Sequence, residues 1–340
     1  MRYLDIGTAK KISRIGLGTW QFGSREWGYG EAYADRGAYQ IVRRALELGV
    51  TLFDTAEIYG AGRSEQILGR ALGEHGESVF IADKVFPLAP GGPRLKQRAK
   101  ASASRLSVPR LDLYQVHYPN PLAGDRMIMR GMRSLQRAGL VGEVGVSNYS
   151  VARWRTAENR LRTRVLSNQV EYSLVNRSPE LDLLPFAEAH DRIIIAFSPL
   201  AQGLLSGHYH GRSAPADGLR RASSHFSPEN MERTKPLIGV LREVAQAHAA
   251  TPAQIALAWA LRRPVVAVIP GASSVEQLEH NVAAAEIQLA DDEYQALQTA
   301  SAWARDPAPA HAPLRGTLRD LKHCAGIGLY WITHYRMITG

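Results

Sequence analysis

Four side chains in the first part of the chain have types and spacing that could perform proton chemistry. Asp54 and Tyr59 lie in the stretch LFDTAEIYG, Lys84 lies near the end of SVFIADKV, and His117 ends LDLYQVH. A phenol with a reference pKa of about 10 is a poor proton donor at neutral pH unless a nearby cation stabilises the phenolate. Lys84 could supply the cation, Asp54 could keep the ammonium charged and oriented, and His117 could position a carbonyl oxygen by donating a hydrogen bond. Together the four residues predict general acid catalysis on a carbonyl group.

Each of these residues also has a purely structural explanation when it is taken alone. Asp54 and Lys84 could form an ion pair at the rim of a sheet, since buried charges are normally paired. His117 could be a hydrogen-bonded histidine of the core, and Tyr59 is one of 13 tyrosines, so a tyrosine before a glycine is not informative by itself. The functional interpretation depends on all four residues following three successive strand-like runs.

The elements that must position these residues are eight short apolar or β-branched runs, at 12–19, 50–54, 78–85, 111–117, 140–147, 165–170, 193–198 and 265–269. Segments with helical periodicity lie between them, for example 38–49, 64–73 and 237–249, and several end at a glycine where a helix C-cap would fall. Alternating strands and helices imply a parallel sheet, and eight such units predict a closed (β/α)8 barrel (TIM barrel) of the α/β class. Such a barrel brings all the carboxyl ends of its strands to one face, where active sites are built.

We expect one barrel domain over residues 1–300 and a C-terminal extension over 301–340. The stretch 201–235 is rich in Gly, Ser, Arg and Pro and predicts a long loop after the seventh strand. Long loops in compact domains are usually functional or disordered. The extension contains the apolar segment CAGIGLYWITHYRM, for which we expect a role as a lid, in association, or in sealing the barrel.

Composition narrows the class of protein. The chain of 340 residues is 45% hydrophobic and 21% charged, which is ordinary for a globular protein with a large core. No apolar run approaches the about 20 residues of a membrane span, and the N-terminus lacks the apolar core of a signal peptide, so we expect a cytoplasmic protein. The single cysteine, Cys324, excludes an intramolecular disulfide and a cysteine-based zinc site, and no metal is expected. The net charge of +9 comes from scattered arginines, which argues against nucleic acid and fits an anionic small ligand.

Further motifs extend the pattern over about residues 3–300: GLGTWQFG, FDTAEIYGAGRSEQILGRAL, IADKV, LDLYQVHYPN, GEVGVSNYS, SNQVEYS, AFSPLAQGLLSGHY and IPGASSVEQLEHN. With these motifs the sequence resembles the aldo-keto reductase superfamily, NAD(P)H-dependent (β/α)8 enzymes with an Asp, Tyr, Lys and His tetrad. The resemblance implies that Tyr59 is the general acid, that Lys84 and Asp54 tune it, and that His117 orients the carbonyl.

The same resemblance implies a nicotinamide cofactor. Ser147, Asn148 and Gln169 would hold the nicotinamide amide, and Phe197 would stack on its ring. Further cofactor contacts are implied for Gly18, Thr19, Trp20, Ser198, Leu200, Gln202, Gly203, Arg221, Gly271, Ser273, Gln277 and Asn281. The stretch GLGTWQ begins like the Rossmann fingerprint but has Gln21 in place of its third glycine, so a Rossmann domain is rejected.

NADPH is the expected cofactor, with NADH as the alternative. Arg221, Ser273 and, when it is protonated, His208 could bind the 2′-phosphate. Relatives often carry lysine where this chain has His208 and glutamate where it has His280, which weakens the inference about cofactor choice.

An aromatic, apolar substrate pocket is expected from Trp20, Trp27, Tyr29 and Tyr118, and it is consistent with aldehydes, ketones or quinones. The physiological substrate and the oligomeric state cannot be read from the sequence. Two other functions stay open: a lyase that forms a Schiff base through Lys84, and a cofactor-binding regulatory subunit similar to the channel-associated β subunits. Those subunits carry asparagine where this chain has His117, which favours a working reductase.

Overall fold

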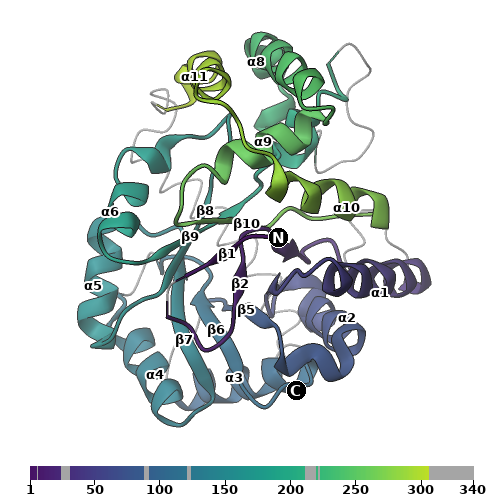
Figure 1. The fold of residues 1–340 in the computed structure, drawn as a ribbon. Helices are drawn as coiled ribbons and strands as arrows, with labels where there is room; N and C mark the ends of the chain where they lie inside the picture. The colour runs from purple at the N-terminus through teal and green to yellow at the C-terminus, as the bar shows by residue number, and fades with distance from the viewer. Residues whose placement is uncertain are drawn as a thin grey trace.

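A barrel of eight parallel strands forms the centre of the computed structural model (Figure 1), which describes residues 1–5, 7–23, 31–87, 92–120, 124–210, 220 and 223–305. The strands are β3 Leu17–Gly18, β4 Leu52–Asp54, β5 Phe80–Val85, β6 Leu111–Val116, β7 Val141–Ser147, β8 Ser167–Glu171, β9 Ile193–Phe197 and β10 Val266–Val268. Neighbours in the sheet follow chain order from β3 to β10. Parallel bridges from Ile15 to Val268 and from Gly18 to Gly271 join the first strand to the last. The predicted (β/α)8 barrel is confirmed.

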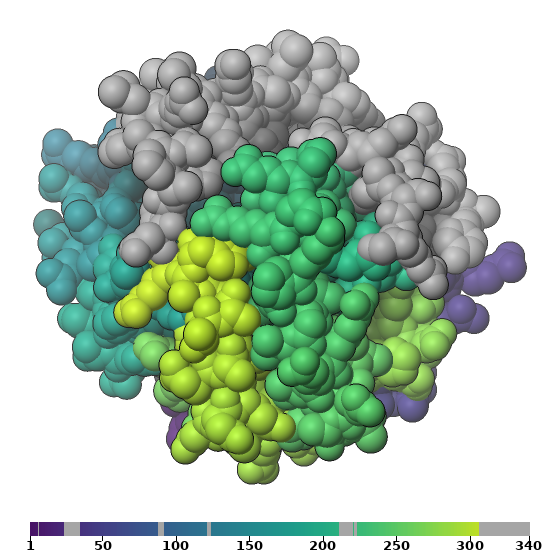
Figure 2. All heavy atoms as spheres, turned by 90° about the horizontal axis from the view of Figure 1, so that it is seen from above, coloured from purple at the N-terminus to yellow at the C-terminus, as the bar shows by residue number. Residues whose placement is uncertain are grey.

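Helices surround the sheet and connect its strands (Figure 1). The α-helices are α1 Glu31–Glu47, α2 Arg63–Leu72, α3 Gly92–Arg105, α4 Arg126–Arg137, α5 Val151–Leu161, α6 Leu183–Ala189, α8 Pro228–Ala247, α9 Pro252–Ala260, α10 Val275–Ala283 and α11 Asp291–Ala300. Short 3-10 helices are η2 Tyr59–Gly62, η3 Gly73–Glu77, η4 Ser178–Glu180, η5 Ala201–Ser206, η6 Ser224–Phe226, η7 Ala284–Glu286 and η8 Ala302–Ala304. Helices α8 and α11 pack against each other on one face of the molecule (Figure 2).

Local sequence signals explain where several helices begin. The Ser150 side chain accepts a hydrogen bond from the backbone N–H of Arg153 at the start of α5. Thr251 and Gln254 form a capping box at the start of α9, so each side chain satisfies a backbone N–H that the helix itself leaves unpaired.

The barrel interior is apolar at one end and polar at the other. Inward-facing Leu, Ile, Phe and Ala side chains of the strands form one buried cluster. An antiparallel hairpin of β1 Tyr3–Leu4 and β2 Ile12–Ser13 adds Leu4 and Ile12 to this cluster and closes its end of the barrel. Polar side chains gather at the other end, where the strands reach their carboxyl termini.

The outward faces of the strands are covered by helices through a larger apolar cluster. Val116 of β6, Val144 and Val146 of β7 and Trp154 of α5 all belong to it and are buried. Because both faces of each strand are buried, the strands appear in the sequence as continuous apolar runs rather than as alternating patterns. This is why all eight could be located from the sequence.

The prediction of a loop over 201–235 is wrong at the C-terminal end of that range. Helix α8 begins at Pro228, not after residue 235, because Ser227 caps it by accepting from the backbone N–H of Asn230 and because proline suits the first helical position. The beginning of the loop contains η5, and residues 211–219 and 221–222 lie outside the described residues.

The C-terminal extension is described only as far as residue 305. Its first residues are anchored to the loop after β8, because Arg177 donates from its backbone N–H to the Ala304 carbonyl (2.8 Å) and from its guanidinium to Ser301 Oγ (2.9 Å). The proposed lid or assembly segment lies outside the described residues. Among those described, no helix has both the length and the apolar composition to cross a membrane.

Gly145 allows two polar side chains to meet across strand β7. It is in register with Gln115 of β6 on one side and with Ser167 of β8 on the other. Ser167 Oγ donates to Gln115 Oε1 over a distance of 3.2 Å. A Cβ atom at position 145 would lie 2.4 Å from Ser167 Oγ and 2.8 Å from Gln115 Cγ.

Gly145→Ala is therefore expected to destabilise the protein by about 1–3 kcal/mol through overpacking. Gly37→Ala is the matched control, because Gly37 lies in helix α1 and a Cβ there meets nothing within 4 Å. In a helix interior that change should stabilise by about 0.5–1 kcal/mol. Urea unfolding of both variants measures the difference, and equal stabilities would contradict the packing argument.

Candidate active site

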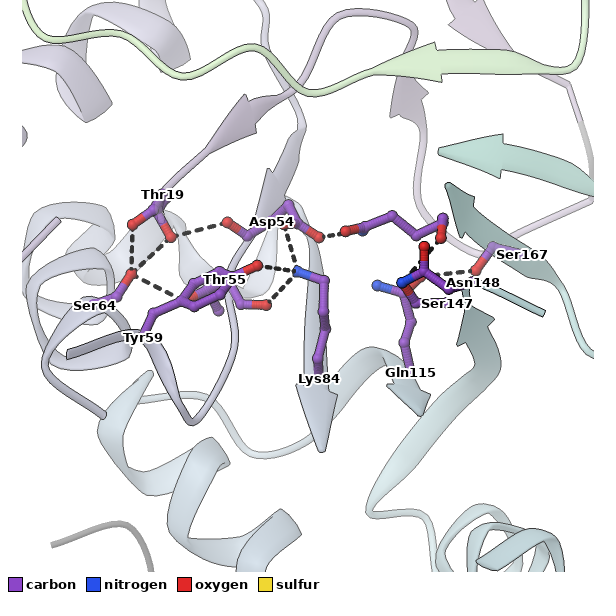
Figure 3. A network of polar contacts seen from close by, with 11 residues as sticks. Thr19, Asp54, Thr55, Tyr59, Ser64, Lys84, Gln115, Ser147, Asn148 and Ser167 are labelled. Atoms are coloured by element: carbon purple, nitrogen blue, oxygen red, sulfur yellow. Dashed lines mark hydrogen bonds and ion pairs between the residues drawn. The ribbon is translucent and has the colours of Figure 1, made fainter. Parts of the chain in front are cut away.

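The Lys84 ammonium lies at the centre of a buried polar network at the carboxyl ends of the strands (Figure 3). Its Nζ donates to Asp54 Oδ1 (2.6 Å), to the Thr55 carbonyl (2.9 Å) and to Tyr59 Oη (3.2 Å). These three bonds match the three N–H groups of an ammonium. Lys84 is fully buried and Asp54 is 2% exposed, so the ion pair is isolated from solvent.

Strand register and a tight turn bring these residues together. Asp54 is in register with Ala82 on the neighbouring strand. Lys84 lies two residues further along β5, on the same face of the strand as Ala82. Tyr59 begins η2, just after the turn that follows β4. Gly60 and Gly62 have φ of 56° and 87°, left-handed values that favour glycine and let the chain reverse into α2.

His117 completes the predicted group of four. It follows β6, and its backbone N–H donates to the Val85 carbonyl (2.9 Å). Its ring lies edge-on to that of Tyr59, with 5.7 Å between centroids and an interplanar angle of 80°. The structure thus gathers Asp54, Tyr59, Lys84 and His117 in one place, and these four are called the tetrad below.

The electrostatic surroundings keep the Tyr59 hydroxyl protonated. Burial raises the pKa of Tyr59 well above 10.0, and the negative charge of Asp54 raises it further, as does that of Asp83 when Asp83 is ionised. The sequence predicted the opposite net direction, with Lys84 lowering this pKa. The reason for the difference is chiefly that burial disfavours the charged phenolate, and the negative charge of Asp54 adds to this effect. Burial also raises the pKa of Asp54, and the Lys84 ammonium and the Gln169 amide oppose that rise.

The residues expected to hold the nicotinamide form a hydrogen-bonded chain that ends on the tetrad. Asn148 Nδ2 donates to Ser147 Oγ (3.0 Å), and Ser147 Oγ donates to the Gln169 carbonyl (2.9 Å). Gln169 Nε2 in turn donates to Asp54 Oδ2 (2.7 Å). Asn148 has φ of 60°, a strained value for a residue other than glycine.

The loop after β9 carries the next group of predicted cofactor residues in an unusual backbone conformation. Ser198, Ala201, Gln202 and Gly203 all have positive φ, between 48° and 96°. Non-glycine residues rarely adopt such angles, and clusters of them occur at ligand-binding sites. The Gln202 carbonyl accepts from Arg220 Nε (2.9 Å), which ties this loop to a later segment. Phe197 and Leu200 beside it are half-buried.

The loop after β10 is closely fitted to the loop after β3. A Cβ atom at Gly18 would lie 2.8 Å from the Ile269 carbonyl oxygen, and one at Gly271 would lie 2.6 Å from the Gln21 side chain. Gln21 Nε2 donates to the Ala272 carbonyl (2.9 Å). The two glycines therefore allow close backbone approach at the predicted cofactor site.

The remaining candidates lie in helix α10 and in the residues just before it. Gln277 Oε1 accepts from the Ser273 backbone N–H (2.9 Å) and hydroxyl (2.7 Å), and Asn281 Nδ2 donates to the Gly271 carbonyl (3.3 Å).

Thr19, another predicted cofactor residue, is fully buried, and its hydroxyl donates to the Asp54 carbonyl (2.9 Å). Thr19 therefore supports the strand that carries Asp54 rather than facing solvent.

The structure describes half of the predicted substrate pocket. Trp20 is 40% exposed. Tyr118 is half-buried and its ring stacks on that of His117, with centroids 4.9 Å apart. Trp27, Tyr29 and the cofactor candidate Arg221 lie outside the described residues.

Sequence reasoning missed a second buried charge cluster on the opposite side of strand β5. Arg98 binds Glu57 through two nitrogens, and Arg105 Nε donates to Glu65 Oε2 (2.7 Å). Asp83, which is adjacent to Lys84 in the strand and so points the other way, is also fully buried. Glu57 and Glu65 stand among other polar residues of the FDTAEIYGAGRSEQ motif, so no local pattern marked them as buried.

Comparison with known proteins places this site in a family. The model of the Aldo/keto reductase family matches residues 14–302. An uncharacterized oxidoreductase of Mycobacterium bovis is 55% identical over 301 residues, which cover 88% of this chain and 93% of the relative. Methylglyoxal reductase YeaE of Escherichia coli is 31% identical over 293 residues, 85% of this chain and 91% of the relative. The structure of an aldo/keto reductase from Klebsiella pneumoniae in complex with NADP and acetate has a TM-score of 0.72 at 29% identity and covers 90% of this chain and 96% of its own.

The barrel, its polar strand ends and these relatives define the class of protein as an NAD(P)H-dependent oxidoreductase. More closely, the chain belongs to the aldo/keto reductase family.

The second charge cluster has a consequence for stability. It contains three acids and two arginines, and burial together with the negative charges of Glu65 and Glu57 raises the pKa of Asp83 well above its usual value of 3.8. Asp83 is therefore protonated in the folded protein under conditions in which the unfolded chain would ionise it. Folding takes up a proton, and the stability that a protonated Asp83 provides at low pH is lost as pH rises from about 3.8 towards the folded-state pKa.

Asp83→Asn should remove this loss, because the amide is neutral at every pH. The variant is expected to be more stable than the wild type above pH about 4, by up to about 1.4 kcal/mol for each pH unit until the folded-state pKa is reached. Asp182→Asn, at an exposed position, should instead follow the wild type. Urea unfolding measured from pH 4 to pH 8 tests this, and parallel curves for wild type and Asp83→Asn would contradict it.

Proposed function

We propose that this protein reduces an aldehyde or ketone to an alcohol, with Tyr59 as proton donor and NADPH as hydride source. The observation that carries the proposal is the triple hydrogen bond of the buried Lys84 ammonium to Asp54, the Thr55 carbonyl and Tyr59. This arrangement places a fixed cation beside the oxygen that becomes negative when Tyr59 gives up its proton.

The residues around the site fit a nicotinamide. Among the residues that the structure describes, the Asn148 amide makes one side-chain donation, from Nδ2 to Ser147, which leaves its oxygen and one amide hydrogen for a ligand. The strained loop at 198–203 offers backbone groups in unusual directions. A bound NADPH would supply the hydride to the carbonyl carbon.

The chain's own residues handle the proton. His117 lies beside Tyr59 and can orient the carbonyl oxygen by donating a hydrogen bond. Tyr59 Oη transfers its proton to that oxygen as negative charge develops there, and Lys84 Nζ stabilises the resulting phenolate. Asp54 holds Lys84 in place throughout, and solvent restores the proton to Tyr59 afterwards.

The Schiff-base alternative is disfavoured by the same geometry. A lysine nucleophile must be a neutral amine with a free lone pair. Lys84 is instead paired with a carboxylate at 2.6 Å and directs hydrogen bonds to three oxygen atoms. For the regulatory-subunit alternative, the presence of His117 in contact with Tyr59 favours turnover.

Tyr59→Phe is expected to bind NADPH nearly as well as the wild type and to lose about 10²- to 10⁴-fold in kcat, the usual contribution of a general acid. Lys84→Met should be comparably inactive, and it should also destabilise the protein by about 3–5 kcal/mol because Asp54 loses its buried partner. Tyr39→Phe, at a position 49% exposed on α1, is the matched control. NADPH oxidation with a panel of carbonyl compounds gives the rates. Unchanged turnover in Tyr59→Phe would refute the proposal.

NADPH is proposed over NADH on the basis of charge. The 2′-phosphate requires cations or several donors, and the candidates are Arg221 and Ser273, with His208 contributing charge only when protonated. Arg221 is proposed as the main anchor. The solved relative from Klebsiella pneumoniae is a complex with NADP.

Arg221→Ala should weaken NADPH binding by roughly ten- to a hundredfold, as expected for a lost charge-assisted contact, and leave NADH binding nearly unchanged. Arg220→Ala is an instructive comparison, because Arg220 holds the Gln202 loop and its loss should weaken both cofactors alike. Fluorescence titration of each variant with each cofactor gives the dissociation constants. An equal change for both cofactors in Arg221→Ala would remove Arg221 from the phosphate site.

A further inference from the structure

The Asp54 carboxylate is held by two donors from opposite parts of the barrel. Its Oδ1 accepts from Lys84 Nζ, and its Oδ2 accepts from Gln169 Nε2 at 2.7 Å. Asp54 and Gln169 are each 2% exposed, so water has little access to this carboxylate. A buried carboxylate requires hydrogen-bond donors, and a bond to a charged group is stronger than one between neutral groups.

Gln169 has to cross the barrel to make this bond. It lies on β8, 115 residues after Asp54 on β4, and these strands are not neighbours in the sheet. The bond therefore forms inside the barrel, above its apolar layer. The backbone carbonyl of Gln169, in contrast, accepts from Ser147 Oγ on the neighbouring strand β7.

The charge of Asp54 determines which way the Gln169 amide faces. An ionised carboxylate only accepts hydrogen bonds, so the NH₂ group of Gln169 must point toward Asp54. The amide oxygen is then the atom left for a ligand, and it can only accept. The NH₂ group of Gln169 is thus hydrogen-bonded to Asp54 of the tetrad, and its amide oxygen is left for a cofactor.

We propose that Gln169 is a positioning residue of the tetrad: its amide holds Asp54 ionised and oriented toward Lys84, and thereby keeps Lys84 in place beside Tyr59. This inference rests on the proposed function and adds to the cofactor contact already assigned to Gln169. It also implies that cofactor binding and tetrad geometry are linked through one side chain.

A consequence for pH follows from the bond. Burial raises the pKa of Asp54, whereas Lys84 and Gln169 stabilise the ionised form and lower it. Removing the Gln169 amide should therefore make Asp54 take up a proton at a higher pH. Since a protonated Asp54 holds Lys84 less firmly, the acidic limb of the pH dependence of kcat should move to higher pH.

Gln169→Met tests the proposal, because methionine has a similar length and volume but no amide. At saturating NADPH, kcat at neutral pH should fall by about ten- to a hundredfold, the cost of a lost hydrogen bond to a charged group. The acidic limb of the pH dependence of kcat should move to higher pH by about one unit or more. Circular dichroism and thermal unfolding report whether the variant is folded.

Gln169→Glu keeps the test decisive if Gln169→Met does not fold. The carboxyl group that this substitution introduces could donate to Asp54 when it is protonated. The activity of Gln169→Glu should therefore recover as pH is lowered, opposite to the trend expected for Gln169→Met. Ser147→Ala is the comparison on the cofactor side: it should weaken NADPH binding without moving the acidic limb.

The results separate this inference from the proposed function. A Gln169→Met protein with weaker NADPH binding but with wild-type kcat and acidic limb at saturation would overturn the positioning role. An active Tyr59→Phe protein would instead overturn the proposed function. A lowered kcat together with a shifted limb, in an enzyme that depends on Tyr59, would support the inference.

Discussion

The buried ion pair between Lys84 and Asp54 is the interaction on which the rest of this structure depends. Moving two charges out of water costs several kcal/mol for each unless their hydrogen-bonding capacity is filled. Here both oxygens of Asp54 accept a hydrogen bond, and Lys84 Nζ has three acceptors within 3.2 Å. These partners come from strands β4, β5 and β8 and from the turn after β4. The pair is satisfied only when the barrel has closed, so the chemistry and the fold depend on the same contacts.

Strand β5 separates two groups of buried charges. Lys84 faces the barrel interior, and its neighbour Asp83 faces the helices, where it is buried near two ion pairs and where burial raises its pKa. Burial and the negative charge of Asp54 both raise the pKa of Tyr59. The phenol consequently keeps its proton at rest, while Lys84 is close enough to stabilise the phenolate that would form in the proposed proton transfer. A proton donor needs both properties.

The two ends of the barrel contribute differently to stability and to function. The apolar layer and the hairpin that contributes Leu4 and Ile12 close one end by packing, supported by hydrogen bonds such as that of the Ser13 backbone N–H to Thr51 Oγ1. The other end carries the tetrad, the amide side chains and the strained backbone at Asn148 and at 198–203. This is the usual division in barrels of this kind, where the carboxyl ends of the strands carry the active site. Substitutions at the apolar end should act on folding and those at the polar end on turnover.

The sequence by itself determined the eight strands, their parallel arrangement and the four tetrad residues. Apolar runs and the polar residues that follow them are local signals, and alternation with helices restricts the topology. Only the tertiary structure decided that Gln169 reaches Asp54 across the barrel, that Gly145 makes room for Gln115 and Ser167, and that Asp83 is buried among other acids. Contacts of this kind depend on strand register and barrel closure, which bring together residues far apart in the chain and leave no mark in the local pattern. The direction of the Tyr59 pKa shift was likewise decided by the tertiary structure, because it results from burial and from charges on separate strands.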